Sequence, residues 1–581
     1  MTIHYAHSEN CVGHKHRLLD HLSGVARLAE QFAVAAGTEA EARLAGLLHD
    51  LGKYADRFQK RLEGQDQGLD HWSLGAHLAL YQYRSAAAAL AIQGHHIGLQ
   101  SLSRDDLLAI NPQKLTENHP QGLALSEADP ALLKARLQAD GLIPTTPEMP
   151  LISGTLKSGF DTMLDIRLLF SALVDADFID TEAHFQGGRE GKRYRPEGLT
   201  LHAETALQRV LAHIHHLATQ TRADSRVATV RQTVLDASLA SAEQQPGLFT
   251  LTAPTGSGKT LAMLAFALAH AARHGLRRVI LVVPYLSIIE QTAAIYRDLL
   301  GADAVLEHHS LAGLGAEDRA TDDEDEAGQS RERRRRLLAE NWDAPIVITT
   351  SVQMLESLFS NRPSACRKLH RLAGSVILFD EVQTLPTGLV LPTLATLSHL
   401  ACRYQASVVF ATATQPAFEH LHERVQTHVA GGWQPRPIVP NPERLFSPLR
   451  RVKRHWNSPD EPLSWPDLAA QLREARQVLC IVNLKRQAKT LWEMLDDDDS
   501  FHLSTNLCAA HRQRVLTEVR RRLRDDEPVR LIATQCVEAG VDVDFPVVFR
   551  AYGPLEAIIQ AEGRCNREGR RSEPGDMHIF L

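Results

Sequence analysis

The chain has 581 residues, of which 44% are hydrophobic, so it is long enough for about three domains with packed cores. A net charge of -7 rules out a generally basic surface, so any nucleic acid must bind in a local groove. No apolar run is long enough to cross a membrane, and the N-terminus lacks the core of a signal peptide. The seven cysteines are widely separated, which is typical of a cytoplasmic protein with reduced thiols.

The first 185 residues are predicted to form an all-helical domain. Apolar residues recur at helical spacing from Leu18 to Phe32, and Gly37 can end that helix. Further helices are expected over about 39–51, 71–93 and 161–182, whereas the proline-rich region 100–150 is expected to be loop with short helices. Residues 186–224 are predicted to be a linker that includes a helix at about 201–220.

From residue 225 onward, short runs rich in Val and Ile alternate with helical segments, which is typical of buried parallel strands. The expected strands are 248–252, 278–283, 345–350, 375–379, 407–411, 477–482, 529–533, 547–549 and 577–580. We therefore expect two α/β lobes, residues 225–430 and 431–581. A charge-segregated insert (322–326 acidic, 331–336 basic) is interpreted as a solvated loop and helix face.

A candidate phosphate cradle, Ala253–Thr260, lies between a predicted strand and a predicted helix. Gly256 and Gly258 allow backbone N–H groups to turn toward phosphate oxygens, and Lys259 can reach the outer phosphates. Alanine stands at position 253 where this motif usually has glycine, so the match is a variant. An ordinary glycine-rich turn is the alternative, and the Lys-Thr ending argues against it. The predicted nucleotide-binding residues here are Thr255, Gly256, Ser257, Gly258, Lys259 and Thr260, whose hydroxyl can hold magnesium.

Other polar residues stand at the ends of the predicted strands. Asp380 can hold the magnesium ion and Glu381 can polarise the attacking water, because ligands bind at this edge of such sheets. Arg564 and Arg567 share one helix face, preceded by Gln560, and can point across a cleft at the outer phosphate. Residues expected to contact a phosphodiester backbone are Pro284, Ser287, Thr349, Thr350 and Thr534.

This order of segments resembles the superfamily 2 helicases over residues 225–581. The resemblance implies two RecA-like lobes that close on ATP and magnesium and step along one nucleic-acid strand. It also implies that Gln232 is the adenine-side glutamine found ahead of the phosphate cradle.

Ten of the 29 histidines fall in the first hundred residues. His49 and Asp50 are adjacent at the end of an apolar run, and neighbours on a helix point about 100° apart. That pair suits a dinuclear site in which Asp50 bridges two metals, since ions ~3.5–4 Å apart can bind both the attacking and leaving oxygens of a phosphodiester. Further candidate ligands on other segments are His21, His71, His95, His96 and either Asp175 or Asp177.

The histidine pattern resembles the HD metal-dependent phosphohydrolases over about residues 14–185. The resemblance implies a basic ligand set of His21, His49, Asp50 and Asp177, with His71, His95 and His96 as the extra ligands of dinuclear members. Asp177 is preferred over Asp175 because of the Ala-Asp-Phe-Ile context. Two interpretations of Lys53 stay open: it contacts the scissile phosphate, or it is exposed.

An N-terminal HD domain followed by this motor, with His-Asp-Leu-Gly-Lys at 49–53 and Leu-Val-Asp-Ala-Asp at 173–177, resembles the CRISPR-associated helicase–nuclease of type I systems. The resemblance implies that a multisubunit crRNA-guided surveillance complex opens target DNA and recruits this protein to the single strand of the R-loop. The HD metals then nick that strand, and ATP hydrolysis reels it past them in the 3′-to-5′ direction. Manganese, iron, cobalt or nickel suits histidine-rich ligation better than magnesium.

Two other function classes stay open: a motor-only remodelling ATPase with a structural or dead metal site, and an RNA helicase that carries an HD phosphodiesterase. The family usually has a further C-terminal domain, whereas this sequence stops just after a strand expected at 577–580. Either a compact variant or a shortened sequence accounts for that ending.

Overall fold

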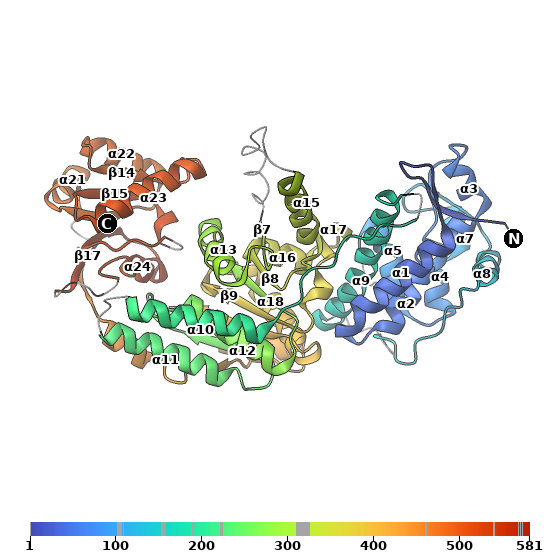
Figure 1. The fold of residues 1–581 in the computed structure, drawn as a ribbon, viewed down its shortest axis with the longest axis horizontal. Helices are drawn as coiled ribbons and strands as arrows, with labels where there is room; N and C mark the ends of the chain where they lie inside the picture. The colour runs from blue at the N-terminus through green and yellow to red at the C-terminus, as the bar shows by residue number, and fades with distance from the viewer. Residues whose placement is uncertain are drawn as a thin grey trace.

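The computed structural model describes residues 2–100, 107, 110–152, 159–188, 191–220, 225–309, 326–458, 462–538, 541–567, 569, 571 and 573–581. Of the acidic run at 322–326, residues 322–325 lie outside them, and Glu326 begins a helix. The described chain forms three blocks in a row, with a helical N-terminal domain at one end, a first α/β lobe in the middle and a second lobe at the other end (Figure 1). None of the helices in these ranges is long and apolar enough to span a bilayer.

The N-terminal domain is mainly helical, but it also contains short strands that we did not expect. Its helices are α1 (Leu18–Ala33), η1 (Val34–Ala36), α2 (Glu39–Leu48), η2 (Leu51–Tyr54), α3 (Asp56–Leu62), α4 (Ser73–Tyr81), α5 (Ala86–Ile97), α7 (Pro112–Glu117), α8 (Pro130–Ala139) and α9 (Phe160–Phe185). Strands β1 (Tyr5–Glu9) and β2 (Lys15–Arg17) form an antiparallel hairpin, and β3 (Leu69–Asp70) pairs with β4 (Ala124–Leu125). The helix expected at 71–93 is two helices, because Ser85 caps α5 by accepting from the Ala88 N–H.

Helix α9 is the centre of the N-terminal domain and also its connection to the first lobe. It packs against α1 and α5 on one side and against α17 (Pro363–Cys366) and α18 (Val390–Arg403) on the other. One continuous apolar core therefore joins the domain to one face of the first lobe. Because α9 packs on both sides, its buried residues are not confined to one face, which explains its weak amphipathic pattern in the sequence.

The first lobe is a parallel sheet with helices on both faces. Its strands, in the order β11-β5-β10-β9-β6-β8-β7, are β5 (Leu248–Thr252), β6 (Arg278–Val283), β7 (Val305–His308), β8 (Ile346–Thr350), β9 (Ser375–Asp380), β10 (Ser407–Thr412) and β11 (Arg436–Pro437). Successive β6 residues alternate between the two cores, with Leu281 on the face of α12 and Val282 on the other. The remaining helices are α10 (Ala203–Gln220), α11 (Ser225–Ser241), α12 (Lys259–His274), α13 (Leu286–Leu300), α15 (Glu326–Asn341), α16 (Ser351–Phe359), η3 (Leu369–Leu372), η4 (Val382–Thr384), η5 (Thr387–Leu389), η6 (Phe418–Leu421), α19 (His422–Gln426), α20 (Glu443–Phe446) and η7 (Ser447–Leu449).

Two expected boundaries shift in the structure. Helix α10, placed in the predicted linker, packs on α12 and α13 and buries Val210 in the core of the first lobe (Figure 1). The stretch predicted to start the second lobe also belongs to the first, because β11 pairs with β5 and Ile438 enters the same core. Which domain α10 and β11 belong to is clear only from the elements against which they pack.

The second lobe is a smaller parallel sheet in the order β12-β17-β16-β13-β15-β14. Its elements are β12 (Val452–Trp456), α21 (Trp465–Glu474), β13 (Gln477–Ile481), α22 (Lys485–Leu495), β14 (Ser500–Leu503), α23 (Ala509–Arg524), β15 (Val529–Ala533), η8 (Gln535–Val537), β16 (Val547–Ala551), α24 (Leu555–Glu562) and β17 (Gly575–Phe580).

A buried ion pair fixes α9 to the first lobe. Asp175 is fully buried, and its carboxylate accepts from Arg367 Nε at 2.9 Å and from Asn341 Nδ2 at 2.9 Å. Arg367 also binds Glu340 at 2.8 Å. Asp175 therefore holds the interface between the N-terminal domain and the first lobe.

Replacing Asp175 with alanine should destabilise the protein by about 3 kcal/mol, because it leaves Arg367 buried with only Glu340 as its anion. Urea unfolding followed by circular dichroism measures the change. The control is Asp56→Ala, which removes an exposed Asp–Arg pair of similar length (Arg136 Nη1 to Asp56 Oδ1, 2.8 Å) and should cost less than about 1 kcal/mol. Equal effects of the two substitutions would contradict the role given to Asp175.

Candidate metal centre and nucleotide site

Close helix contacts bring the histidines of the N-terminal domain together. Gly46 allows α2 to approach α1, since a Cβ at this position would lie 2.5 Å from the Ala26 Cα. This approach sets His21 of α1 against His49 at the end of α2, with the two Nε2 atoms 3.2 Å apart. His49 is oriented by Nδ1, which bonds the Gly46 carbonyl at 2.9 Å.

The carboxylate of Asp50 lies at the centre of the cluster and is 1% exposed. Its Oδ2 lies 3.2 Å from His21 Nε2 and 3.3 Å from His49 Nε2. Its Oδ1 faces a second set of imidazoles, at 3.4 Å from His71, 3.5 Å from His95 and 3.8 Å from His96. The two oxygens of one carboxylate therefore face two separate groups of nitrogen donors.

Asp177 joins the first group from α9. Its Oδ1 lies 3.5 Å from His21 Nε2 and 3.7 Å from His49 Nε2. The structure thus gathers two candidate metal-binding sets that share Asp50, one made by His21, His49, Asp50 and Asp177 and the other by Asp50, His95 and His96. His71 reaches the second set through its Nε2, 2.9 Å from His96 Nε2.

The protonation and bonding of the second set fit a divalent metal. Burial lowers the pKa of His71 well below its ordinary value and that of His95 to about 4, so both imidazoles are neutral and have a lone pair to donate. Asp50 Oδ1 and His95 Nε2 are buried and have no hydrogen-bond partner among the described residues. Buried polar atoms without partners are costly, and a bound cation would satisfy both.

The sequence left two questions open: whether Lys53 is exposed, and whether Asp175 or Asp177 is the metal ligand. Lys53 is 4% exposed, so it is not a surface residue, and its Nζ lies 2.6 Å from Asp50 Oδ2. Asp175, two residues before Asp177, turns instead to Arg367 in the first lobe. The two aspartates therefore lie in different environments.

Four residues near the cluster were not assigned from the sequence. Asp180, one turn after Asp177, lies with Oδ2 2.9 Å from His21 Nδ1 and so orients that ring. Lys192 donates to Asp180 at 2.7 Å from the segment after α9. His7 and His16, on the β1–β2 hairpin, lie beside His21, with their Nδ1 atoms 3.0 Å apart. The three-residue spacing of Asp177 and Asp180 on one helix could have indicated that Asp180 also faces the cluster. No local sequence pattern indicates that the β1–β2 hairpin packs beside His21.

The phosphate cradle forms the predicted turn between β5 and α12. Gly256 has φ +81° and Gly258 has φ +76°, conformations that favour glycine, and α12 begins at Lys259. Lys259 Nζ lies 2.9 Å from Asp380 Oδ1 and 3.1 Å from Glu381 Oε1. Burial works to lower the pKa of Lys259, but these two carboxylates outweigh it and raise the pKa above its ordinary value.

The carboxylate of Glu381 connects the two lobes. It accepts from Gln383 Nε2 at 2.7 Å, and Gln560 of the second lobe donates to the same oxygen at 3.4 Å. Gln383 also accepts from the Thr412 hydroxyl at 2.6 Å, which links the ends of β9 and β10. Gln383 was not assigned a role from the sequence.

The two arginines of the second lobe bond within that lobe. Arg564 is 6% exposed and donates to the carbonyls of Val537 and Glu538. Arg567 Nη1 lies 2.7 Å from Asp542 Oδ1. A third arginine, not assigned from the sequence, reaches the cradle, since Arg451 donates to the Thr255 carbonyl at 3.2 Å.

The structure does not bring Gln232 to the cradle. Its side chain is exposed on α11 and donates to Asp236 at 2.7 Å, whereas the adjacent Arg231 donates to the Gly256 carbonyl at 2.9 Å. The remaining cradle residues, Ser257 and Thr260, lie on the loop and in the first turn of α12.

Two of the five residues expected to contact nucleic acid have hydrogen bonds within the protein. Thr349 is fully buried and donates to the His308 carbonyl at 2.9 Å, and Thr350 caps α16 by accepting from the Gln353 N–H. Thr534 is 6% exposed at the end of β15. Pro284 follows β6, and the side chain of Ser287 lies outside the described residues. The Thr349 hydroxyl has therefore used its donor within the protein, whereas the Thr350 hydroxyl accepts and keeps its own O–H, although Thr350 is only 8% exposed.

Three family models match successive parts of the chain. An HD domain matches residues 18–129, a DEAD/DEAH box helicase matches 231–421, and the C-terminal part of the CRISPR-associated nuclease/helicase Cas3 matches 474–570. The order of these three matches is the order predicted from the motifs.

Curated relatives carry the same description. The chain is 26% identical to the CRISPR-associated nuclease/helicase Cas3 of Haloferax volcanii over 660 residues, covering 90% of this chain and 70% of that relative. It is 25% identical to the protein of the same description in Methanothermobacter thermautotrophicus over 359 residues, covering 58% of this chain and 40% of that one.

Solved structures share the fold. The crystal structure of T. fusca Cas3-AMPPNP matches with a TM-score of 0.68 at 18% identity, over 100% of this chain and 75% of that one. A chain of a CRISPR RNA-guided surveillance complex, pre-nicking, matches with a TM-score of 0.62 at 19% identity, over 100% and 74%. The expected fold class, a helical HD domain followed by two helicase lobes with parallel sheets, is confirmed. The chain is therefore similar over most of its length to CRISPR-associated nuclease/helicases, and its HD domain and DEAD/DEAH box helicase domain support nuclease and ATP-dependent helicase activity.

Proposed function

We propose that this protein degrades single-stranded DNA during CRISPR interference, with the HD cluster as a metal-dependent nuclease and the two lobes as an ATP-driven translocase that feeds it. The observation that carries the proposal is the carboxylate of Asp50, whose two oxygens face two separate sets of histidines. Such an arrangement is what a pair of ions bridged by one carboxylate requires.

In this proposal His21, His49 and Asp177 share the first ion with Asp50, and His71, His95 and His96 share the second. The donors are mainly imidazole nitrogens, which favour manganese, iron, cobalt or nickel over magnesium. When bound, such a pair supplies Lewis acidity and an activated water next to a phosphodiester.

The chain's own residues would position the substrate and the ligands. Asp180 holds the His21 ring through Nδ1, which directs Nε2 toward Asp50. Lys53, whose ammonium group lies beside Asp50, would bind a non-bridging oxygen of the scissile phosphate. The DNA strand would approach past His96. Its side chain is 39% exposed, more than that of any other candidate ligand that contacts Asp50 or Asp177.

The motor would act through the cradle between β5 and α12. Backbone N–H groups of residues 255–260 would hold the phosphates, Lys259 would bind the outer ones, and Thr260 with Asp380 would hold magnesium. Glu381 would orient the attacking water. Gln560 already contacts Glu381 across the lobes, and Arg564 and Arg567 would exchange their present partners for the outer phosphate when the lobes close.

The proposed substrate and partner follow from the family. A matching solved chain belongs to a CRISPR RNA-guided surveillance complex before nicking, which supports recruitment to a multisubunit crRNA-guided complex of type I. The displaced single strand of its R-loop would be the DNA that this chain nicks and then reels in, in the 3′-to-5′ direction.

The substitution His49→Ala should reduce metal-dependent cleavage of single-stranded DNA at least about 100-fold, because it removes one ligand of the first ion and leaves Asp50 less well positioned. The assay uses manganese without ATP, so the motor does not contribute. His215→Ala, which changes an exposed histidine on α10, should leave cleavage unchanged. Full cleavage by His49→Ala would exclude the nuclease centre and favour a motor-only protein.

ATP hydrolysis should be stimulated more by single-stranded DNA than by RNA of the same sequence, because the 2′-hydroxyl distinguishes the two polymers. Steady-state phosphate release measures both rates. Lys259→Ala should lower each of them at least about 100-fold, whereas Lys489→Ala, on the exposed face of α22, should not. A stronger response to RNA would favour an RNA helicase with an HD phosphodiesterase.

A further inference from the structure

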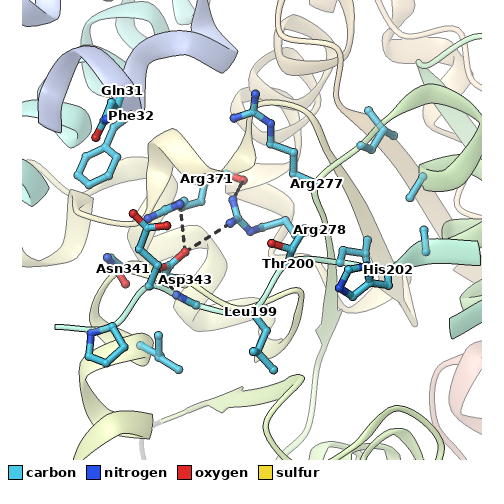
Figure 2. Close-up of a pocket in the computed structure, with 18 of the residues that line it drawn as sticks. Gln31, Phe32, Leu199, Thr200, His202, Arg277, Arg278, Asn341, Asp343 and Arg371 are labelled. Carbon is cyan, nitrogen blue, oxygen red and sulfur yellow. Dashed lines mark hydrogen bonds and ion pairs between the residues drawn. The ribbon is translucent and has the colours of Figure 1, made fainter. Parts of the chain in front are cut away.

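A cavity of about 990 Å³ lies at the seam between the N-terminal domain and the first lobe (Figure 2). The C-terminal half of α1, the segment 194–205 and the start of β6 form its walls. Strands β5, β10, β9 and β6 are parallel, so the start of β6 and the phosphate cradle at the end of β5 lie at opposite edges of the sheet. The cavity is therefore separate from the nucleotide site of the motor.

The cavity has an excess of positive charge. Five arginines line it against three acids, and these residues are Arg27, Arg195, Arg277, Arg278, Arg371, Glu197, Glu204 and Asp343. Since each guanidinium stays charged near neutral pH, the walls carry two more positive than negative groups. An anionic ligand matches that balance.

The arginines of the sheet edge share a single carboxylate. Asp343 Oδ1 lies 3.1 Å from Arg371 Nη1 and 3.9 Å from Arg278 Nη2, and Asp343 Oδ2 accepts from the Gly198 N–H at 2.8 Å. Figure 2 shows both arginines turned toward Asp343. Arg277, next to Arg278 in the chain, is exposed; its backbone N–H donates to the Gly374 carbonyl at 2.9 Å, but its guanidinium has no ion pair or hydrogen bond to any residue in the described ranges. Its guanidinium is available to a ligand.

Two buried polar atoms at the wall also lack partners. Arg371 Nε and Asn341 Oδ1 have no hydrogen bond within the described part of the chain, and Asn341 is 2% exposed. Burial, together with Arg371 and Arg277, lowers the pKa of Arg278 to about 9, against the opposing effect of Asp343. Arg195 is paired with Glu182 and Glu340, so the unused groups of this half-open cavity are the Arg277 guanidinium, the Arg371 Nε donor and the Asn341 Oδ1 acceptor.

We propose that this cavity binds a small phosphorylated ligand of nucleotide size, with Arg277 and Arg371 on the phosphate and Asn341 on a donor of the sugar or base. The planar fork of a guanidinium matches two phosphate oxygens at once. The volume lies within the range of small-molecule sites, about 300–1,000 Å³.

A ligand in the cavity could influence the metal centre through residues that connect the two sites. Tyr194 forms part of the wall, and its hydroxyl donates to Asp180, the residue that holds His21. A ligand in the cavity would rest on the segment that fixes the orientation of one HD ligand. The site is therefore placed to act as an effector site for the nuclease.

Isothermal titration calorimetry on the full chain tests the proposal, with Mg·AMPPNP in excess to fill the motor site and no transition metal added. The titrants are AMP and the 5′-phosphorylated dinucleotide pTpT, which represent a free nucleotide and a DNA strand end. The test variant is Arg277→Glu, which reverses an exposed charge and should not disturb folding. The matched control is Arg273→Glu, which reverses an exposed charge on the same segment outside the cavity walls.

At least one titrant should bind the wild type and Arg273→Glu with equal affinity and bind Arg277→Glu at least tenfold more weakly. The titrant that binds more tightly identifies the source of the phosphate. Equal affinities of Arg277→Glu and Arg273→Glu would overturn the proposal, and so would the absence of binding by both titrants at millimolar concentration.

Discussion

A single buried carboxylate, that of Asp50, organises the N-terminal domain. Taking an isolated carboxylate out of water is costly unless cationic or hydrogen-bonding partners surround it. Here Lys53 and a ring of imidazoles supply those partners, and they come from separate segments, η2, α1, α2, α5 and the residue after β3. The helices must converge within a few ångströms for this to happen, which requires the close packing that Gly46 allows.

The same helix that completes the cluster also binds the motor. Along α9, Asp177 and Asp180 face the histidines, whereas Asp175 and Ser171 face Arg367 and His370 of the first lobe. One continuous apolar core lies between them. The HD centre is therefore held rigidly relative to the sheet that carries the phosphate cradle, and a strand delivered by the motor would meet a site in a fixed place.

The positions of several candidate site residues were predictable from the sequence, because metal ligands and phosphate-binding loops need particular residue types at short spacings. His49-Asp50, the glycine-rich turn and Asp380-Glu381 are examples, and the structure brings each to the expected element. The two central sheets were predictable as well, since their buried strands are continuous apolar runs.

What escaped prediction depends on contacts between distant segments. The β1–β2 hairpin is short and histidine-rich, so it has no strand pattern, yet it places His7 and His16 beside His21. Helix α10 and strand β11 belong to the first lobe because of their packing and strand pairing, which no local sequence pattern predicts. The partners of Arg564, Gln560 and Arg451 lie in other loops or in the other lobe, so their roles appear only once the lobes are assembled.

The central claim is that Asp50 bridges two ions. Anomalous diffraction from crystals of the protein soaked in manganese measures this directly. The account predicts two peaks ~3.5–4 Å apart, one on the side of His21 and His49 and the other on the side of His71 and His95. A single peak, or two peaks that do not share the Asp50 carboxylate, would contradict it.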